Sequence, residues 1–179
     1  SAMMSNGKLV YGAVDMEGAV GQMIIQTDGV RHRDRENCYG CLESYVSIYA
    51  LEQQAISRLK QGRRSLLREI APHPEAVDYS HLLRALEQND PLTVEIFTQA
   101  ATYFGIGLAN LLNILHPEKV ILGGPLITGS DLFFQTSTEV ALRNAYYYPT
   151  YHVEFAKERQ GEDTVAIGAA AMVINALAE

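Results

Sequence analysis

Cysteine, basic residues and long apolar runs are all scarce in this 179-residue chain. The two cysteines, Cys38 and Cys41, are too few for the disulfide framework of a secreted domain. The 14 Lys and Arg against 21 Asp and Glu give a net charge of −7, which argues against broad nucleic-acid binding, because phosphate contacts need clustered basic residues. No apolar run reaches the roughly 18–20 residues of a membrane span, and the sequence contains no charged-then-apolar pattern typical of a signal peptide. We therefore expect a soluble cytoplasmic protein that does not enter a membrane.

The composition instead favours one folded domain or one lobe of a larger protein. Hydrophobic residues make up 47% of the chain, which is enough for a core. Residues 1–4 read like a cloning remnant, so we expect the folded unit to cover residues 5–179. Turn signals at Asn6-Gly7 and Asp28-Gly29 predict paired strands within residues 5–30. Helical spacing and capping signals predict helices over residues 41–62, 65–70, 79–87, 91–116, 130–146 and 164–178.

Two short apolar runs lie between the last three predicted helices. Lys119-Val-Ile-Leu122 and His152-Val-Glu-Phe155 are typical of buried strands. Gly105 and Gly107, inside the longest helix, indicate that another backbone approaches closely. The alternation of strand and helix in the second half predicts an α/β lobe.

Four motifs together carry a family resemblance. They are Glu17-Gly-Ala-Val-Gly-Gln22, Gly40-Cys-Leu-Glu43, Leu115-His-Pro-Glu-Lys-Val-Ile-Leu-Gly-Gly124, and Gly161-Glu-Asp163 running into Ile167-Gly-Ala-Ala-Ala171. In their order and spacing they resemble the ROK family of repressors and sugar kinases over essentially the whole chain. The resemblance implies the C-terminal lobe of an actin/hexokinase-like (ribonuclease H-like) fold, with a mixed sheet and flanking helices.

The same resemblance implies which chemistry this chain does not hold. In the family, sugar and nucleotide lie between two lobes, and the first lobe carries the catalytic Asp and an Asp-x-Gly-x-Thr phosphate loop. Neither is found in this sequence. Because phosphoryl transfer depends on that base and that phosphate cradle, we expect no kinase activity from this chain alone.

The resemblance also implies a zinc site that is altered here. The family binds zinc through one His and three Cys, but Gln22 stands at the position of the His, and the cysteine loop is shortened to Cys38-Tyr-Gly-Cys41. Cys38, Cys41 and His32 remain as candidate ligands, with Asp34 or Glu36 as a fourth. The alternative is a loop that has lost its metal, because a structural zinc site needs four ligands. Zinc is the one cofactor the sequence suggests.

The sugar-contacting positions are partly kept. Glu43 matches a family glutamate that accepts hydrogen bonds from sugar hydroxyls, although a glutamate there also stabilises a helix N-terminus. Ala19 replaces the family's other glutamate, so Glu17 and Gln22 become the candidate substitutes. The turn at Gly123 and Gly124 matches one near the nucleotide in kinases, and it reads equally as a tight turn between strand and helix.

The resemblance favours a sugar-responsive transcriptional regulator, in which this lobe senses the effector and forms a homodimer. DNA would then be bound only by an upstream segment outside this chain. The alternative is the C-terminal part of a ROK sugar kinase of the glucokinase or N-acetylhexosamine kinase type. A third interpretation is a lobe without a ligand that associates with itself.

Overall fold

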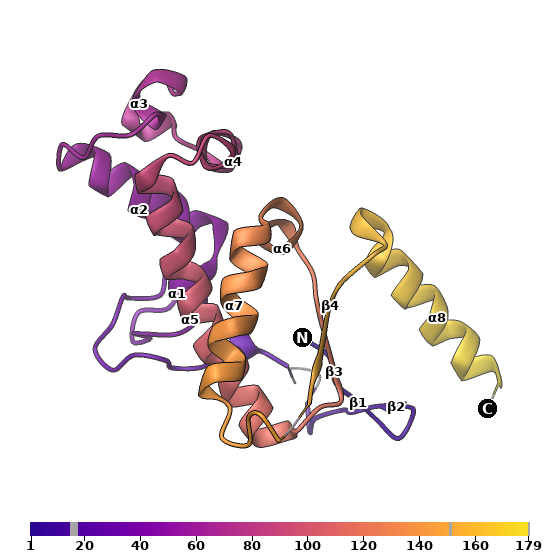
Figure 1. Ribbon diagram of the computed structural model, residues 1–179. Coiled ribbons are helices and arrows are strands. Elements are labelled where there is room, and N and C mark those ends of the chain that lie inside the picture. Colours follow the sequence, from indigo (N-terminus) through magenta and orange to yellow (C-terminus); the bar gives the residue numbers. More distant parts are fainter. Residues whose placement is uncertain (15–17, 151, 179) are drawn as a thin grey trace.

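A computed structural model describes residues 1–14, 18–150 and 152–178 (Figure 1). Helices dominate it, and two small sheets accompany them. The expected mixed α/β architecture is therefore confirmed. Among the described residues, no helix combines the length and the apolar character needed to cross a bilayer.

The chain begins with a hairpin of two very short strands. β1 (Met4–Ser5) pairs antiparallel with β2 (Lys8–Leu9). Asn6 and Gly7 between them have φ of 51° and 76°, the positive values that a two-residue type I′ turn requires. The predicted turn at residues 6–7 is confirmed.

The strand pairing predicted within residues 5–30 is wrong in extent, because the apolar run of residues 23–25 does not form a continuous strand. The 3-10 helix η1 (Val20–Gln22) precedes it, and pairing is limited to a single bridge between Ile24 and Cys41. The ladder stops there because the partner segment turns immediately into a helix: Leu42 already has helical dihedral angles. A second isolated bridge, Arg31 to Tyr39, closes the irregular loop that lies between.

The helix predicted over residues 41–62 is two helices. α1 (Glu43–Val46) and α2 (Ile48–Lys60) are separated at Ser47, whose ψ of 153° is extended. The Ser47 hydroxyl accepts a hydrogen bond from the Ala50 amide and so caps the new helix. This cap lets the chain change direction within an uninterrupted apolar pattern.

Three short elements follow: α3 (Leu67–Ile70), η2 (Pro74–Ala76) and α4 (Tyr79–Glu87). Of these, α3 and α4 match the helices predicted over residues 65–70 and 79–87 closely. Asp78 begins α4 as a capping box, accepting the backbone amide of His81 while the His81 ring accepts the Asp78 amide.

α5 (Pro91–Leu115) is the central helix, and it begins and ends as the sequence predicts. Asp90 caps its first turn, Pro91 follows, and His116 closes it in the left-handed region. It packs along α7 (Asp131–Asn144), and a Cβ added at Gly105 would lie 2.7 Å from the Ser137 backbone oxygen. The predicted close approach of a second backbone is confirmed at Gly105. At Gly107 it is wrong, because an added Cβ would instead meet the Leu42 side chain, at 2.7 Å.

The second sheet has two parallel strands. β3 (Lys119–Leu122) pairs with β4 (Glu154–Lys157), starting at Lys119 opposite Glu154, and α6 (Pro125–Gly129) and α7 form the crossover. In Figure 1 the strands lie between α7 and α8 (Thr164–Ala178), which follows η3 (Gly161–Asp163). β4 starts two residues later than predicted, and β3 is not buried as predicted, since Ile121 is 65% exposed. In the described part of the chain only one face of this sheet is covered, by α5 and α7.

The core lies where α2, α4, α5 and α7 meet. Its largest fully buried side chains include Leu51, Leu82, Phe97, Leu112 and Phe133. Burying each contributes roughly 1.5–3 kcal/mol, so this core holds the helices firmly in place. The start of α1 packs against α2 and α5 and is therefore held by this core.

Candidate functional site

Three residues singled out by the sequence meet at the start of α1. Gln22 ends η1, Glu43 begins α1, and the Gln22 side-chain amide donates to Glu43 Oε2 over 2.8 Å. His32 comes from the loop between them, and its Nε2 lies 3.5 Å from the same oxygen. The structure therefore places His32, predicted as a metal ligand, beside the predicted sugar-binding carboxylate.

The loop fixes the orientation of the His32 ring. The Asp34 backbone amide donates to His32 Nδ1 over 3.1 Å, and the His32 amide donates to the Cys38 carbonyl over 2.7 Å. Because Nδ1 accepts a hydrogen bond, the neutral ring carries its proton on Nε2, which faces Glu43. The His32 side chain is only 8% exposed, so this arrangement is built into the fold.

Arg35 belongs to this cluster, although it was not among the residues predicted to form the site. Its guanidinium donates to Gln22 Oε1 over 2.6 Å. This contact orients the Gln22 amide so that its NH₂ group points to Glu43. The only signal was the short basic stretch of residues 31–35, which reads as a solvated loop.

The arrangement leaves a carboxylate that can accept further hydrogen bonds. The Glu43 side chain is 49% exposed, and the donors described here all approach its Oε2. A carboxylate has about four lone-pair positions, so the remaining ones can accept hydroxyl groups. A polyhydroxylated ligand is the chemistry that suits such a group. Glu17, the other candidate for this task, lies outside the described residues.

The candidate zinc ligands do not all converge, since Cys38 and Cys41 are neighbours but His32 faces Glu43. Cys38 and Cys41 are buried free thiols, Cys41 Sγ lies 3.1 Å from Ser44 Oγ, and His32 faces Glu43. Burial raises the pKa of the Cys38 thiol, and the neighbouring Cys41 raises it further. Within the described ranges, no three His, Cys, Asp or Glu side chains are placed to hold a metal ion. This donor set does not fit a four-ligand zinc site.

The glycine pair at residues 123–124 forms the turn from β3 into α6. Gly124 has a φ of 100°, which only glycine adopts readily, and Pro125 begins the helix. A Cβ on Gly123 would lie 2.6 Å from the Glu158 side chain. A cavity of about 250 Å³ opens at this turn against Phe104 and Phe133. The turn thus has both a structural demand for glycine and a small apolar pocket beside it.

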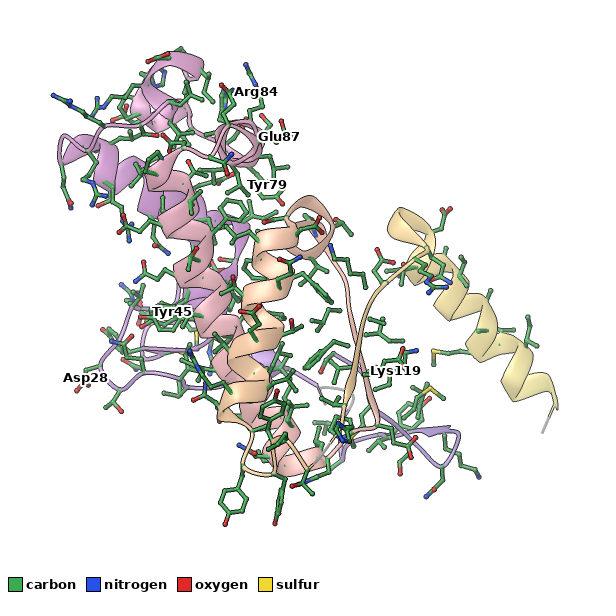
Figure 2. The ribbon with its side chains drawn as sticks, viewed as in Figure 1. Asp28, Tyr45, Tyr79, Arg84, Glu87 and Lys119 are labelled. Carbon is green, nitrogen blue, oxygen red and sulfur yellow. The ribbon has the colours of Figure 1, made fainter. Side chains whose placement is uncertain are left out.

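A much larger polar groove begins at Glu43. It encloses about 1260 Å³ between the loop of residues 26–34, α2 and α5. Figure 2 shows two of its lining residues, Asp28 and Tyr45, on the side of α5 away from α7. The Glu43 cluster is therefore one end of an extended groove.

Comparison with known proteins gives consistent matches. The ROK family pattern matches residues 1–176. The chain is 28% identical over 178 residues to the xylose repressor of Caldicellulosiruptor bescii, covering 98% of this chain and 43% of that protein. It is 26% identical over 178 residues to the regulator NagC of Escherichia coli, covering 99% and 42%. A ROK glucokinase from Streptomyces griseus, solved with glucose and AMPPNP, shares the fold with a TM-score of 0.80 at 23% identity, covering 96% and 55%. The chain thus spans less than half the length of these two curated relatives.

Proposed function

Because the chain belongs to the ROK family, we propose that it is the effector-sensing and dimerisation lobe of a sugar-responsive ROK transcriptional regulator. The single observation that carries this proposal is the half-exposed Glu43 carboxylate, held by Gln22 and faced by His32 at the mouth of a large polar groove. Two relatives that match almost the whole chain support it, one named as a xylose repressor and one as a DNA-binding transcriptional dual regulator.

The cluster suits recognition of a ligand better than its chemical conversion. Gln22 and His32 both present hydrogens to Glu43, and Arg35 in turn holds Gln22. Each partner restrains the carboxylate, so it is preorganised to accept hydroxyl groups with little further loss of side-chain freedom. Recognition of a neutral sugar needs such fixed acceptors.

The proposal includes three partners: DNA, a second copy of the protein and a sugar effector. We assign DNA binding to a segment outside this chain, because the net charge of −7 disfavours phosphate contacts by the chain itself. We further propose that the protein is a cytoplasmic homodimer with a sugar or sugar derivative as its effector.

The experiment exchanges the Glu43 carboxylate for an amide. Glu43→Gln keeps the shape of the side chain but removes its charge, and Glu87→Gln on the distant helix α4 is the matched control (Figure 2). Isothermal titration with xylose, glucose and N-acetylglucosamine is expected to detect at least one ligand. Charge-assisted hydrogen bonds contribute about 1.5–3 kcal/mol, so Glu43→Gln should weaken binding about 10- to 100-fold, and Glu87→Gln should not. Absence of binding, or equal binding by Glu43→Gln, would refute the proposal.

The kinase alternative has one observation in its favour, the turn at Gly123 and Gly124 beside an apolar pocket. If that turn approaches a nucleotide, AMPPNP should bind this chain, and Gly124→Val should abolish the binding. ATP-dependent phosphorylation of a sugar by this chain would decide for the kinase reading and against the regulator.

A further inference from the structure

The groove that starts at Glu43 is longer than one sugar ring needs. Its volume of about 1260 Å³ exceeds the roughly 300–1,000 Å³ of typical small-molecule pockets. The Glu43 cluster occupies only one end. The rest of the groove runs along α2 and α5, which pack against each other.

The α2 wall is a polar stripe. Tyr49, Gln53, Ser57 and Gln61 follow one another at four-residue steps, line the groove and are all exposed. Residues at this spacing share one helix face. Twelve residues of helix extend about 18 Å, so the stripe is several sugar rings long.

The α5 wall provides a second row of hydrogen-bonding groups. Gln99 and Tyr103 lie four residues apart on it and line the same groove. Arg58 donates to Gln99 Oε1 over 2.7 Å, which leaves the Gln99 NH₂ group directed elsewhere and able to donate. Among the described residues Gln53, opposite, makes no side-chain hydrogen bond. Both amides are thus open to a ligand.

The charges that line the groove balance. The cations Arg31, Arg33 and Arg58 stand against the anions Asp28, Asp34 and Glu43. Several of them are paired within the protein: Arg33 Nε lies 3.7 Å from Asp34, and Arg58 lies 2.7 Å from Glu95. A groove without surplus positive charge is unsuited to nucleic acid or to a polyphosphate. A neutral ligand fits best.

Aromatic rings stand at the end of the groove nearest Glu43. The ring of Tyr103 lies against the buried Tyr45, with centroids 4.3 Å apart and an interplanar angle of 35°. Tyr49 is 42% exposed, and the Arg33 guanidinium lies 4.5 Å from the centroid of its ring. Rings with one apolar face and a polar tip, set among amides and hydroxyls, complement sugar rings, which have C–H faces and hydroxyl edges.

We propose that this groove binds a neutral oligosaccharide, with its terminal sugar at Glu43 and the following sugars between the amides of α2 and α5. The inference deepens the proposed function and rests on it. It makes the effector class an oligosaccharide rather than a monosaccharide.

The experiment compares ligand length with groove variants of this chain. The probes are glucose and cellotetraose, xylose and xylotetraose, and N-acetylglucosamine with its β-1,4 tetramer, each measured by titration calorimetry. In at least one series the tetramer should bind about tenfold or more tightly than the monomer, since several further hydrogen bonds form. The double variant Gln53→Ala/Gln99→Ala should lower the tetramer affinity to nearly that of the monomer and leave the monomer affinity unchanged. Gln135→Ala, an exposed glutamine on α7, is the matched control and should change neither.

The outcomes separate the two proposals. Equal affinity for monomer and tetramer, with both lost in Glu43→Gln, would overturn the oligosaccharide inference and leave the proposed function standing. Binding of none of the probes would overturn both. A dimer in sedimentation that dissociates in Gln53→Arg would identify the groove as an interface between copies, and this too would overturn the inference.

Discussion

Replacing Asp90 should destabilise the protein more than replacing any other helix-capping residue described above. The residue is only 5% exposed, and its carboxylate accepts four hydrogen bonds at 2.8–2.9 Å. They come from the Ser65 hydroxyl, the Leu66 amide, and both the amide and the hydroxyl of Thr93. One side chain thus begins α5 and also fixes the start of α3. Because α5 forms one wall of the polar groove, the position of that wall depends on this cap.

The magnitude follows from the partners left behind. In Asp90→Ala the α5 cap is lost, which costs about 0.5–2 kcal/mol. The Thr93 hydroxyl, which is fully buried, and the Leu66 amide lose their acceptor, at about 1–3 kcal/mol each. Because these losses overlap, we expect about 3–5 kcal/mol. Asp90→Asn keeps one of the two oxygens and should cost roughly half as much.

Urea unfolding followed by circular dichroism measures these differences. Burial works to raise the pKa of Asp90, but the hydrogen bonds from Leu66, Thr93 and Ser65 outweigh it, so its pKa is lowered. A lowered pKa gives stability that is present at neutral pH and is lost in acid, and Asp90→Asn should lack this component. A loss below about 1 kcal/mol for Asp90→Ala would refute the account, because it would mean that its four donors find other partners.

Three further outcomes are expected. Gly105→Ala should lower the free energy of unfolding by about 1–3 kcal/mol in urea, because the new Cβ would lie 2.6 Å from the Val140 Cβ. Gly168→Ala, with open space around it, is the control and should be neutral or mildly stabilising. Equal effects of the two substitutions would contradict this explanation. The Ser80 hydroxyl and the His81 amide hold the pKa of Asp78 at about 2, so the contribution of Asp78 to stability is complete above pH 3.8 and is lost as the pH falls towards 2. Asp78→Asn should therefore reduce the loss of stability between these two pH values. An unchanged pH dependence in that range would contradict this prediction. Protein purified without chelator should carry far less than one zinc per chain, and stoichiometric zinc that disappears in Cys38→Ser would reverse our reading of the loop.

The sequence predicts the elements that carry their own start and stop signals. α5 was predicted from local chemistry, because Asp90 and Pro91 mark its start and its apolar spacing continues without conflict. α4 was predicted without its cap, Asp78, which is a local signal of the same kind. The division at Ser47 was not predicted, since the apolar pattern of Tyr45, Val46, Tyr49 and Ala50 runs straight through it. An exposed β3 also escaped prediction, because a short apolar run does not reveal what covers it.

The candidate site was predicted residue by residue but not as an arrangement. Gln22 and Glu43 were chosen by resemblance, and their hydrogen bond places them together. The position of His32 beside Glu43 depends on an irregular loop and on its backbone hydrogen bond to Cys38, which no periodicity encodes. Arg35 was missed for the same reason. Loops of this kind are fixed by tertiary contacts, so only the structure reveals them.

The unequal burial of α5 and α8 has a consequence for how the molecule opens. α5 has buried side chains along almost its whole length, so exposing its amides to solvent requires the core itself to come apart. The described side chains of α8 are all exposed, and its backbone hydrogen bonds can break one turn at a time with no loss of core packing. Amide exchange in this chain should therefore span nearly the full range, from global unfolding at α5 to local fraying at α8. A partner that packs against α8 would therefore slow amide exchange in α8 without changing the stability of the core.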